Sequence, residues 1–212
     1  MSPSDSGRPD APRGEDDVDD GLGRIRARHF DARYRADPDP WGLERRWYER
    51  RKRAITLASL GRERYDRAFE PGCALGLLTE LLAERCAHVV AADLSPTTVA
   101  AARRRLDGRA NVEVLQLAVP DEWPDGTFEL VVLSEIGYYL RPGTLARLRD
   151  RAVQSLREGG ELLAVHWRGE SRDHLLHGDE VHDVIGGTIQ LRHRLRHQEE
   201  HFILETFGRV KG

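Results

Sequence analysis

The eight residues from Phe69 to Gly76, Phe-Glu-Pro-Gly-Cys-Ala-Leu-Gly, have the types and spacing of a ligand-binding turn. The largely apolar run 88–92 follows and ends at Asp93, 17 residues after Gly76. This spacing predicts a strand, a glycine-bearing turn, a helix and a second strand that ends on a carboxylate. Such a carboxylate can accept hydrogen bonds from both hydroxyls of a ribose, while backbone N–H groups of the turn bind the rest of the ligand. The pattern indicates a nucleoside site; the alternative is an ordinary strand–turn–helix without a ligand.

The turn differs from that of a dinucleotide-binding protein, which needs G-x-G-x-x-G so that the backbone can approach a pyrophosphate. Here Gly72 and Gly76 flank Ala74, and Glu70 precedes them. An acid beside the turn disfavours a pyrophosphate and favours a positively charged group, such as the amino group of a methionine-derived moiety. The arrangement resembles the first motif of class I S-adenosylmethionine-dependent methyltransferases, which implies S-adenosyl-L-methionine as the cofactor. Because alanine lacks the freedom of glycine at positive φ, we expect the turn to differ slightly at Ala74.

The chain around this motif alternates predicted strands and helices. Fully apolar stretches at 130–133 and 162–165 suit parallel strands that are covered on both faces. Two later strand-like runs, 189–196 and 201–210, are close enough in sequence to form an antiparallel hairpin at the sheet edge. The fold class is therefore predicted to be α/β, a mostly parallel sheet with a C-terminal antiparallel hairpin and helices on both faces. Further strands are expected to end at Glu70 and Asp93 and to span 112–116, 128–133 and 161–166, and helices to span 75–86, 144–156 and 179–185. Ser95 is expected to cap a further helix, 96–106, with Pro96 in its first turn.

The N-terminal segment has a different composition. The first twenty residues carry seven acids against two arginines, so residues 1–22 are predicted to be a disordered acidic tail. Residues 23–212 are predicted to form one domain, in which about 23–60 is a lid segment with a helix near 44–60. Trp41 and Tyr48 are expected to close over the ligand. The arginine-rich side of that helix is interpreted as a solvated face, with nucleic-acid contact as the alternative.

Composition limits the function classes. The formal net charge of −3 and pI of about 6.3 argue against a general nucleic-acid binder. No apolar run approaches the roughly 20 residues that cross a bilayer, and no signal-peptide core is evident, so we expect a cytoplasmic protein without a membrane partner. Cys73 and Cys86 are expected at the two ends of one helix, too far apart for a disulfide. The oligomeric state cannot be inferred from these features.

Polar and aromatic residues follow three further predicted strands, where ligands of parallel sheets bind. After the third strand, Val119 and Trp123 are candidates to contact an adenine, since Ala118 stands where many of these methyltransferases have an acid. After the fourth strand, Glu135 and Tyr138 resemble a motif of amino-methylating members of this superfamily, although its two typical prolines are absent. The resemblance implies that Glu135 accepts a hydrogen bond from a nucleophilic nitrogen. Tyr138 is expected to provide an aromatic wall that favours a developing cation.

His166 ends the fifth strand and is the second candidate proton acceptor, because its unperturbed pKa is near neutrality. Three histidines and several acids in 174–183 suggest a metal site as an alternative. Their spacing is loose and contains no i, i+4 histidine pair, so no metal is predicted. A helix that carries Glu180 and His182 as structural polar groups is the preferred interpretation.

Several motifs together resemble the nodulation protein S family of methyltransferases, from about Phe30 to the C-terminus. They are the segments 39–41, 48–49, 70–73, 135–140, 166–168 and 178–182, and those after the fourth and fifth strands are the most specific. The resemblance implies N-methylation of a small amine, such as the de-N-acetylated glucosamine at the non-reducing end of a chito-oligosaccharide. The alternatives are an O-methyltransferase on a small metabolite, a non-catalytic S-adenosylmethionine-binding subunit and, less favoured, an RNA methyltransferase.

The residues expected to act in the site fall into three groups. The expected catalytic residues are Glu135, His166 and Tyr138. The expected cofactor-binding residues are Glu70, Gly72, Cys73, Gly76, Asp93, Leu94, Val119, Trp123 and Ser134. The expected substrate or lid residues are Trp41, Tyr48, Tyr139 and Trp167.

Overall fold

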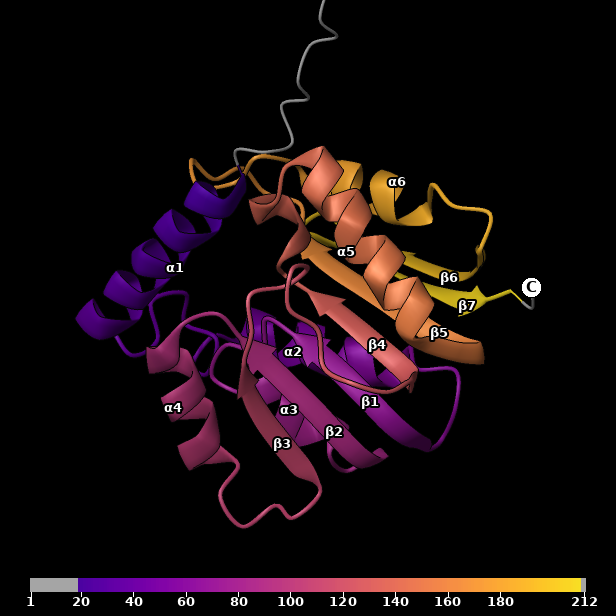
Figure 1. Ribbon diagram of the computed structural model, residues 1–212, viewed down its shortest axis with the longest axis horizontal. Helices are drawn as coiled ribbons and strands as arrows, with labels where there is room; N and C mark the ends of the chain where they lie inside the picture. The colour runs from indigo at the N-terminus through magenta and orange to yellow at the C-terminus, as the bar shows by residue number, and fades with distance from the viewer. Residues whose placement is uncertain (1–18, 211–212) are drawn as a thin grey trace, which may run out of the picture.

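The computed structural model describes residues 19–210, and its centre is a seven-stranded sheet in the order β3-β2-β1-β4-β5-β7-β6 (Figure 1). The neighbours from β3 to β5 pair in parallel, and β7 pairs antiparallel with both β5 and β6. This arrangement confirms the predicted fold class, including the C-terminal hairpin at the sheet edge. The strands are β1 Tyr65–Pro71, β2 Cys86–Asp93, β3 Val112–Gln116, β4 Phe128–Ser134, β5 Leu156–Trp167, β6 Leu191–Gln198 and β7 Phe202–Arg209.

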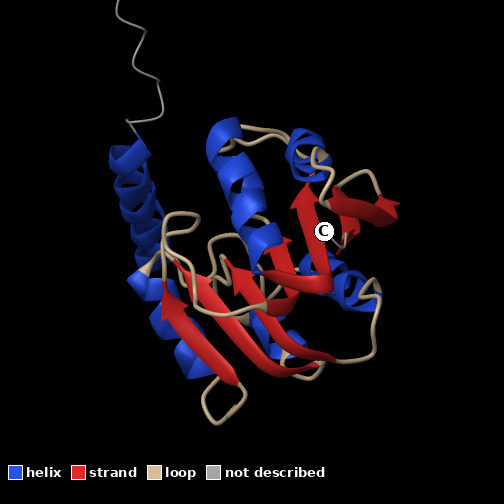
Figure 2. Ribbon diagram, turned by 45° about the vertical axis from the view of Figure 1, so that its right-hand side comes forward, coloured by secondary structure: helices blue, strands red, loops and turns tan. Residues whose placement is uncertain are grey.

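Helices cover both faces of the sheet (Figure 2). Successive side chains of β4 point to opposite faces. Val131 and Leu133 pack with the apolar side chains of α5 and α6, whereas Leu130 and Val132 pack with those of α2 and α3. All four are fully buried, which explains why the strand is apolar at every position. The helices of these layers are α2 Trp47–Ala58, α3 Leu77–Leu82, α4 Pro96–Arg105, α5 Pro142–Ser155 and α6 Gly178–Gly186.

The strand order reverses between β1 and β4, since β2 and β3 extend the sheet to one side and β5 to β6 extend it to the other. Ligands of open parallel sheets bind outside the carboxyl ends of the strands at such a reversal. β1 ends at Pro71, directly before the glycine turn, and β4 ends at Ser134. A short 3-10 helix, η2 Gly137–Tyr139, follows β4. The topology therefore brings two motifs that are more than sixty residues apart to one crevice.

The N-terminal segment contains a helix that the sequence analysis did not predict, α1 Asp19–Ala36. The last four residues of the predicted tail, 19–22, lie in this helix, and residues 1–18 lie outside the described residues. α1 contacts α4 at one side of the molecule, opposite the β6–β7 edge (Figure 1). Its sequence is strongly polar, so periodicity gave little signal for a packed helix.

The helix after the glycine turn is shorter than predicted. α3 ends at Leu82, and Cys86 is the first residue of β2, where it pairs with Tyr65 of β1. β2 pairs in parallel with β1 from Tyr65 onward, so Cys86, which was expected to end the helix, belongs to the strand instead. Cys73 and Cys86 are both free and buried, as expected for two cysteines that form no disulfide.

Candidate active site

A cavity of about 450 Å³ lies at the crevice beyond the carboxyl ends of β1, β2 and β4. This volume falls within the roughly 300–1,000 Å³ of small-molecule sites. The cavity wall also includes residues of α1 and α2 and of the loop before α6. Most of the residues predicted for the site line it: Trp41, Tyr48, Gly72, Asp93, Leu94, Val119, Ser134, Glu135, Tyr138, Tyr139 and Trp167.

One end of the cavity has the features of a nucleoside site. Gly72 and Ala74 both adopt positive φ, +74° and +47°. The N–H of Ala74 donates to Asp93 Oδ2 at 3.0 Å. A Cβ on Gly72 would lie 2.2 Å from Ile136 Cγ2, so only glycine leaves the turn open at this point. Alanine therefore occupies the middle of the turn in the glycine-like conformation, at a conformational cost.

Asp93 is held by several protein donors. Its Oδ1 accepts from Ser95 N at 2.9 Å and from Thr98 Oγ1 at 2.8 Å, while Oδ2 accepts from Ala74 N. Burial raises the pKa of Asp93, and these donors oppose that effect. A carboxylate oxygen accepts about two hydrogen bonds, so Oδ2 can accept a further donor such as a ribose hydroxyl. Asp93 therefore fits the role predicted for it.

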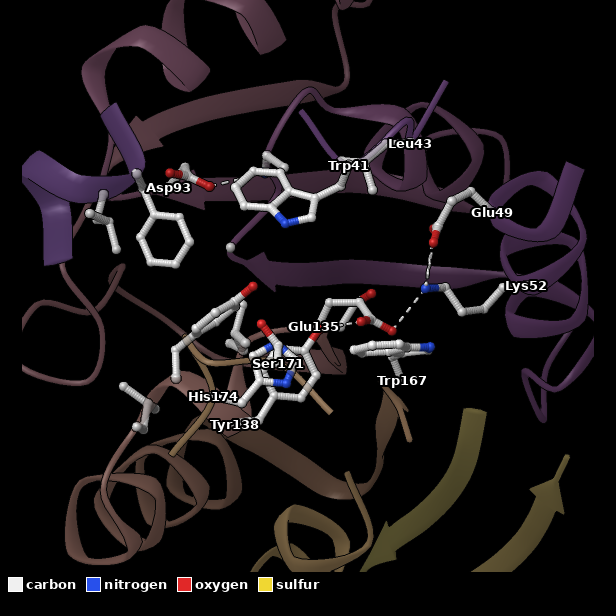
Figure 3. A pocket seen from close by; sticks show the side chains of 18 of the residues that line it. Trp41, Leu43, Glu49, Lys52, Asp93, Glu135, Tyr138, Trp167, Ser171 and His174 are labelled. Atoms are coloured by element: carbon white, nitrogen blue, oxygen red, sulfur yellow. Dashed lines mark hydrogen bonds and ion pairs between the residues drawn. The ribbon is translucent and has the colours of Figure 1, made fainter. Parts of the chain in front are cut away.

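The other end of the cavity contains a charged cluster around Glu135 (Figure 3). Lys52 Nζ lies 2.9 Å from Glu135 Oε1 and 3.1 Å from Glu49 Oε2. The hydroxyl of Tyr138 donates a short hydrogen bond to Glu135 Oε2. Glu135 itself adopts a positive φ of +59°, an uncommon conformation for a residue with a side chain. The backbone and two side-chain partners thus fix one orientation of this carboxylate.

Lys52 is 4% exposed and its charge is balanced by carboxylates. Burial alone lowers the pKa of a lysine, but the charges of Glu135 and Glu49 outweigh burial, so the pKa of Lys52 lies above its ordinary value. The ammonium also lies 5.0 Å from the centre of the Tyr48 ring, within the range of a cation–π contact. Lys52 is therefore a permanent cation beside Glu135 at neutral pH.

Aromatic rings form the wall beside this cluster. Tyr138 is 3% exposed, and its ring stacks on His174 with centroids 3.8 Å apart. Trp167 meets the same histidine edge-on at 5.8 Å. Burial raises the pKa of the Tyr138 hydroxyl well above its ordinary value, so this hydroxyl remains a donor to Glu135. A positive charge that develops here would face aromatic rings and a carboxylate.

α1 forms the outer wall of the cavity and is attached to the domain at two places. Asp31 Oδ1 accepts from Ser95 Oγ at 2.9 Å and from Thr97 N at 3.2 Å, both at the start of α4. Arg33 lies 2.6 Å from Asp173, in the loop before α6. The cavity-lining rings of this wall are Phe30, Tyr34, Trp41 and Tyr139, whose successive contacts have centroids 4.8 to 6.0 Å apart.

Glu70 does not face the cavity, which corrects the expectation that it holds the methionine end of a ligand. Its side chain points toward α3 and accepts from Thr79 Oγ1 at 2.6 Å, and the residue is 2% exposed. Burial raises the pKa of Glu70 to about 8, so it carries little charge at neutral pH. Cys73 and Gly76 also lie behind the turn, where they contact the core and α4 rather than the cavity.

Trp123 is likewise outside the cavity. Its ring packs edge-on against Phe69 at 4.8 Å as part of the core, and its buried Nε1 has no hydrogen-bond partner. Of the two candidates for contact with an adenine, Trp123 therefore does not line the cavity, whereas Val119 does. The apolar residues that line this part of the cavity are Leu94, Leu117 and Val119.

His166 supports the site from behind instead of facing it, because it is fully buried. Its Nε2 accepts from Gly137 N at 3.1 Å, and its Nδ1 lies 3.2 Å from His182 Nε2. His182 Nδ1 lies 2.8 Å from Glu205 Oε2 on β7. Because His166 Nε2 accepts from Gly137, the His166 proton lies on Nδ1 and is donated to His182 Nε2. His182 then carries its own proton on Nδ1 and donates it to Glu205 Oε2. His166 therefore does not line the cavity, and this position gives no support to its predicted role as a proton acceptor for the substrate.

Sequence reasoning missed several residues of the cavity. No role was predicted for Lys52, although it is one of only two lysines in a chain with 31 arginines. The i, i+3 spacing of Glu49 and Lys52 was the available signal for a pair on one helix face. The remaining unpredicted residues of the wall include Phe30, Tyr34, Arg46, Ser171 and His174.

The described residues 19–210 contain no group of three or more histidine, cysteine, aspartate or glutamate side chains that could hold a metal ion. No helix within them is both long and apolar enough to cross a membrane.

Comparisons with known proteins agree with this geometry. Residues 68–160 match the family model described as a methyltransferase domain. A solved structure of a Pseudomonas syringae protein described as a methyltransferase is 44% identical and superposes with a TM-score of 0.70. The alignment covers 77% of this chain and 100% of that one. The chain therefore belongs to the methyltransferases of class I, whose fold and first motif it has.

Within that class, the resemblance to nodulation protein S is confirmed. Nodulation protein S of Rhizobium tropici is 32% identical over 142 residues, which are 65% of this chain and 57% of that protein. The chain thus spans little more than half the length of this curated relative. The structure of the N-methyltransferase NodS from Bradyrhizobium japonicum WM9, in complex with S-adenosyl-L-homocysteine, is 23% identical and has a TM-score of 0.77. It aligns with 87% of this chain over 99% of its own length, and its ligand agrees with the expected cofactor.

Proposed function

We propose that this protein transfers a methyl group from S-adenosyl-L-methionine to the nitrogen of a small polar amine. One observation carries the proposal: a single cavity has an Asp93 carboxylate suited to a ribose at one end and a Glu135 carboxylate framed by aromatic rings at the other. The first feature fits the methyl donor and the second fits an amine that becomes positively charged.

Residues at the Asp93 end of the cavity suit the methyl donor. Asp93 would hold the ribose through its free acceptor capacity, and the turn at Gly72 and Ala74 would accommodate the methionine part. Leu94 and Val119 offer apolar contact to the adenine. When bound, S-adenosyl-L-methionine supplies an electrophilic methyl group on a sulfonium centre. The protein then has little acid or base chemistry to add at the sulfur.

The main contribution of the protein is placement of the acceptor. Holding two reactants in line can supply roughly 7–11 kcal/mol of a barrier. Glu135 has acceptor capacity beyond its bonds to Lys52 and Tyr138, so it can orient an N–H of the acceptor. An ammonium has no lone pair, and the acceptor must be neutral when it attacks. Aromatic rings of the α1 side line the cavity and would limit the access of water to this step.

The substrate class that we propose is an amino sugar with a free amine, alone or at the end of a short oligosaccharide. The name of the curated relatives and the N-methyltransferase activity named for one solved structure support this choice. The site supports it as well, because carboxylates beside the rings of Tyr138 and Trp167 suit a polar ring that carries a cation.

The test is methyl transfer from isotopically labelled S-adenosyl-L-methionine. Glucosamine and short de-N-acetylated chitosan oligomers are the acceptors, and the matching N-acetylated sugars are the controls. We expect label on the free amines and none on the N-acetylated sugars. Equal labelling of both sets would place the methyl group on a hydroxyl and contradict N-methylation. No transfer to any amine acceptor would contradict the proposed substrate class.

A further inference from the structure

Lys52 connects two parts of the chain that meet at the acceptor end of the cavity. Its ammonium lies between Glu135, which follows β4, and Glu49, which lies three residues earlier on α2 (Figure 3). The matched methyltransferase domain spans residues 68–160. It contains Glu135 but neither Glu49 nor Lys52, which lie on α2. The acceptor-facing carboxylate of the domain is therefore held by a side chain from outside it.

The ion pair has a clear electrostatic reason. Glu49 and Glu135 both lie within hydrogen-bond distance of one ammonium, so without that cation two carboxylates would share a largely buried site. Burial raises the pKa of Glu49, whereas Lys52 lowers it. Like charges at such a site do not both remain ionised, and one of the pair takes up a proton. Lys52 thus compensates the charge of both carboxylates of the pair.

Other groups face Glu135 without replacing this effect. His174 is a further basic group that interacts with Glu135, and burial lowers its pKa. Arg46 and Glu170 line the same cavity, and Arg53 acts on Glu49. The titratable groups around Glu135 are Tyr48, Glu49 and Lys52 from α2, Tyr138 and Tyr139 from η2, and His174 from the loop before α6.

We propose that Lys52 is a positioning residue for methyl transfer, which ties Glu135 to Glu49 and so completes the acceptor subsite only when α2 is docked on the domain. The inference rests on the proposed function for its kinetic part. Its structural part, the tie between Lys52 and Glu135, can be measured without turnover.

The structural part is tested by NMR on protein labelled with ¹⁵N-lysine. The chain has only two lysines, and Lys52→Met identifies the Lys52 signal by its loss. We expect the Lys52 ammonium signal to exchange slowly and to remain protonated above pH 10.4, the ordinary pKa of lysine. In Glu135→Gln and in Glu49→Gln it should shift and titrate at lower pH. A Lys52 signal that is unchanged in Glu135→Gln would overturn the tie.

The kinetic part is tested by the pH profile of kcat/KM with the labelled-methyl assay. Wild-type activity should fall on the acid side in two steps, first as the amine substrate takes up a proton and then, at lower pH, as the Glu49–Glu135 pair takes up one; the second fall reports on Lys52. In Lys52→Met this fall should move to higher pH by about one to three pH units, the usual effect of removing an adjacent opposite charge. Lys52→Arg keeps the charge and should leave the acid limb near the wild-type pH, even where its different shape lowers kcat.

Two controls separate positioning from general damage. Arg50→Met removes an exposed cation from the same helix, two residues away, and should leave the profile unchanged. Affinity for S-adenosyl-L-homocysteine should persist in Lys52→Met, because Asp93 and the glycine turn lie at the other end of the cavity. A lower rate with an unshifted acid limb would reduce Lys52 to a structural residue and overturn the proposal. A wild-type protein without turnover would instead contradict the proposed function, and the NMR measurement would still test the tie.

Discussion

Asp93 and Glu135 define the two ends of the site at the scale of single residues, and both were predicted from their places after apolar strands. A strand end is visible in the sequence as the point where an apolar run stops, and the topology brings such points together. The direction of a side chain is less visible. Glu70 ends β1 but points toward Thr79 on α3, and Trp123 packs on Phe69. Their burial depends on contacts with segments that the local sequence does not specify.

Replacing Asp93 tests the nucleoside end. We expect Asp93→Ala to weaken binding of S-adenosyl-L-homocysteine by roughly 1.5–3 kcal/mol, the range for hydrogen bonds to a charged group. Asp93→Asn keeps one oxygen and should lose less. Calorimetric titration provides the measurement, and thermal melting checks that loss of the bond to Ala74 N has not unfolded the turn. If a folded Asp93→Ala protein binds S-adenosyl-L-homocysteine with wild-type affinity, Asp93 does not bind the ribose.

Replacing Glu135 tests the acceptor end. Glu135→Gln keeps the shape but loses the charge, and we expect kcat/KM to fall by about 10²–10⁴, the usual size for a lost general base or acceptor. Binding of S-adenosyl-L-homocysteine should stay nearly intact. The rate of the wild-type enzyme should rise with pH as the amine substrate deprotonates, and the variant should show a blunted rise. A variant that matches the wild-type rate across the pH range would make Glu135 a structural residue.

The elements differ in how well the sequence predicted them. β3 was predicted with its observed bounds and β4 to within one residue, since an apolar strand between two helical layers has a distinct pattern. α4 was predicted from its cap, and Ser95 does accept a hydrogen bond from Thr98 N. α1 was missed because its sequence is strongly polar and shows only weak helical periodicity of apolar residues. β5 begins at Leu156, five residues before the predicted start, because its first part pairs with Phe128 across an irregular register.

A buried histidine chain links η2 to α6 and β7, and it should make stability depend on pH. Burial holds the pKa of His166 well below its ordinary value, so the folded protein disfavours the proton that the unfolded chain binds below about pH 6.5. The contribution of neutral His166 to the free energy of unfolding is fully present above pH 6.5. It is lost as the pH falls, by up to about 1.4 kcal/mol per pH unit.

The variant that checks this is His166→Asn. Urea unfolding should show a free energy lower by roughly 1–3 kcal/mol at pH 7.5, because hydrogen bonds to Gly137 and His182 are lost or weakened. The free energy of unfolding of this variant should decline less steeply between pH 6.5 and 5 than that of the wild type. His88→Asn replaces a half-exposed histidine on β2 and should keep the wild-type slope. An unchanged slope in His166→Asn would show that this histidine does not titrate with unfolding.

At the scale of the whole molecule, the cavity is closed by parts that lie far apart in the chain. The sheet provides the carboxylates, α2 provides Lys52, and α1 spans from α4 to the loop before α6. A lid segment over about residues 23–60 was predicted, with Trp41 and Tyr48 as the residues that close over the ligand. Its attachment could not be predicted, since it depends on Asp31 and Arg33, two charged residues in a segment rich in both signs.

The attachment of α1 should control release of the ligand, because Phe30 and Tyr34 form part of the cavity wall and move only with this helix. Asp31→Ala removes the acceptor for Ser95 Oγ and Thr97 N. We expect S-adenosyl-L-homocysteine to dissociate up to about tenfold faster, which corresponds to about 1.4 kcal/mol and lies near the value of one charged hydrogen bond. Stopped-flow displacement measures the rate. Arg28→Ala, an exposed change on the same helix, is the control and should keep the wild-type rate. If Asp31→Ala also releases the ligand at the wild-type rate, closure of the cavity does not depend on docking of α1 to α4, and the second attachment, between Arg33 and Asp173, becomes the one to test.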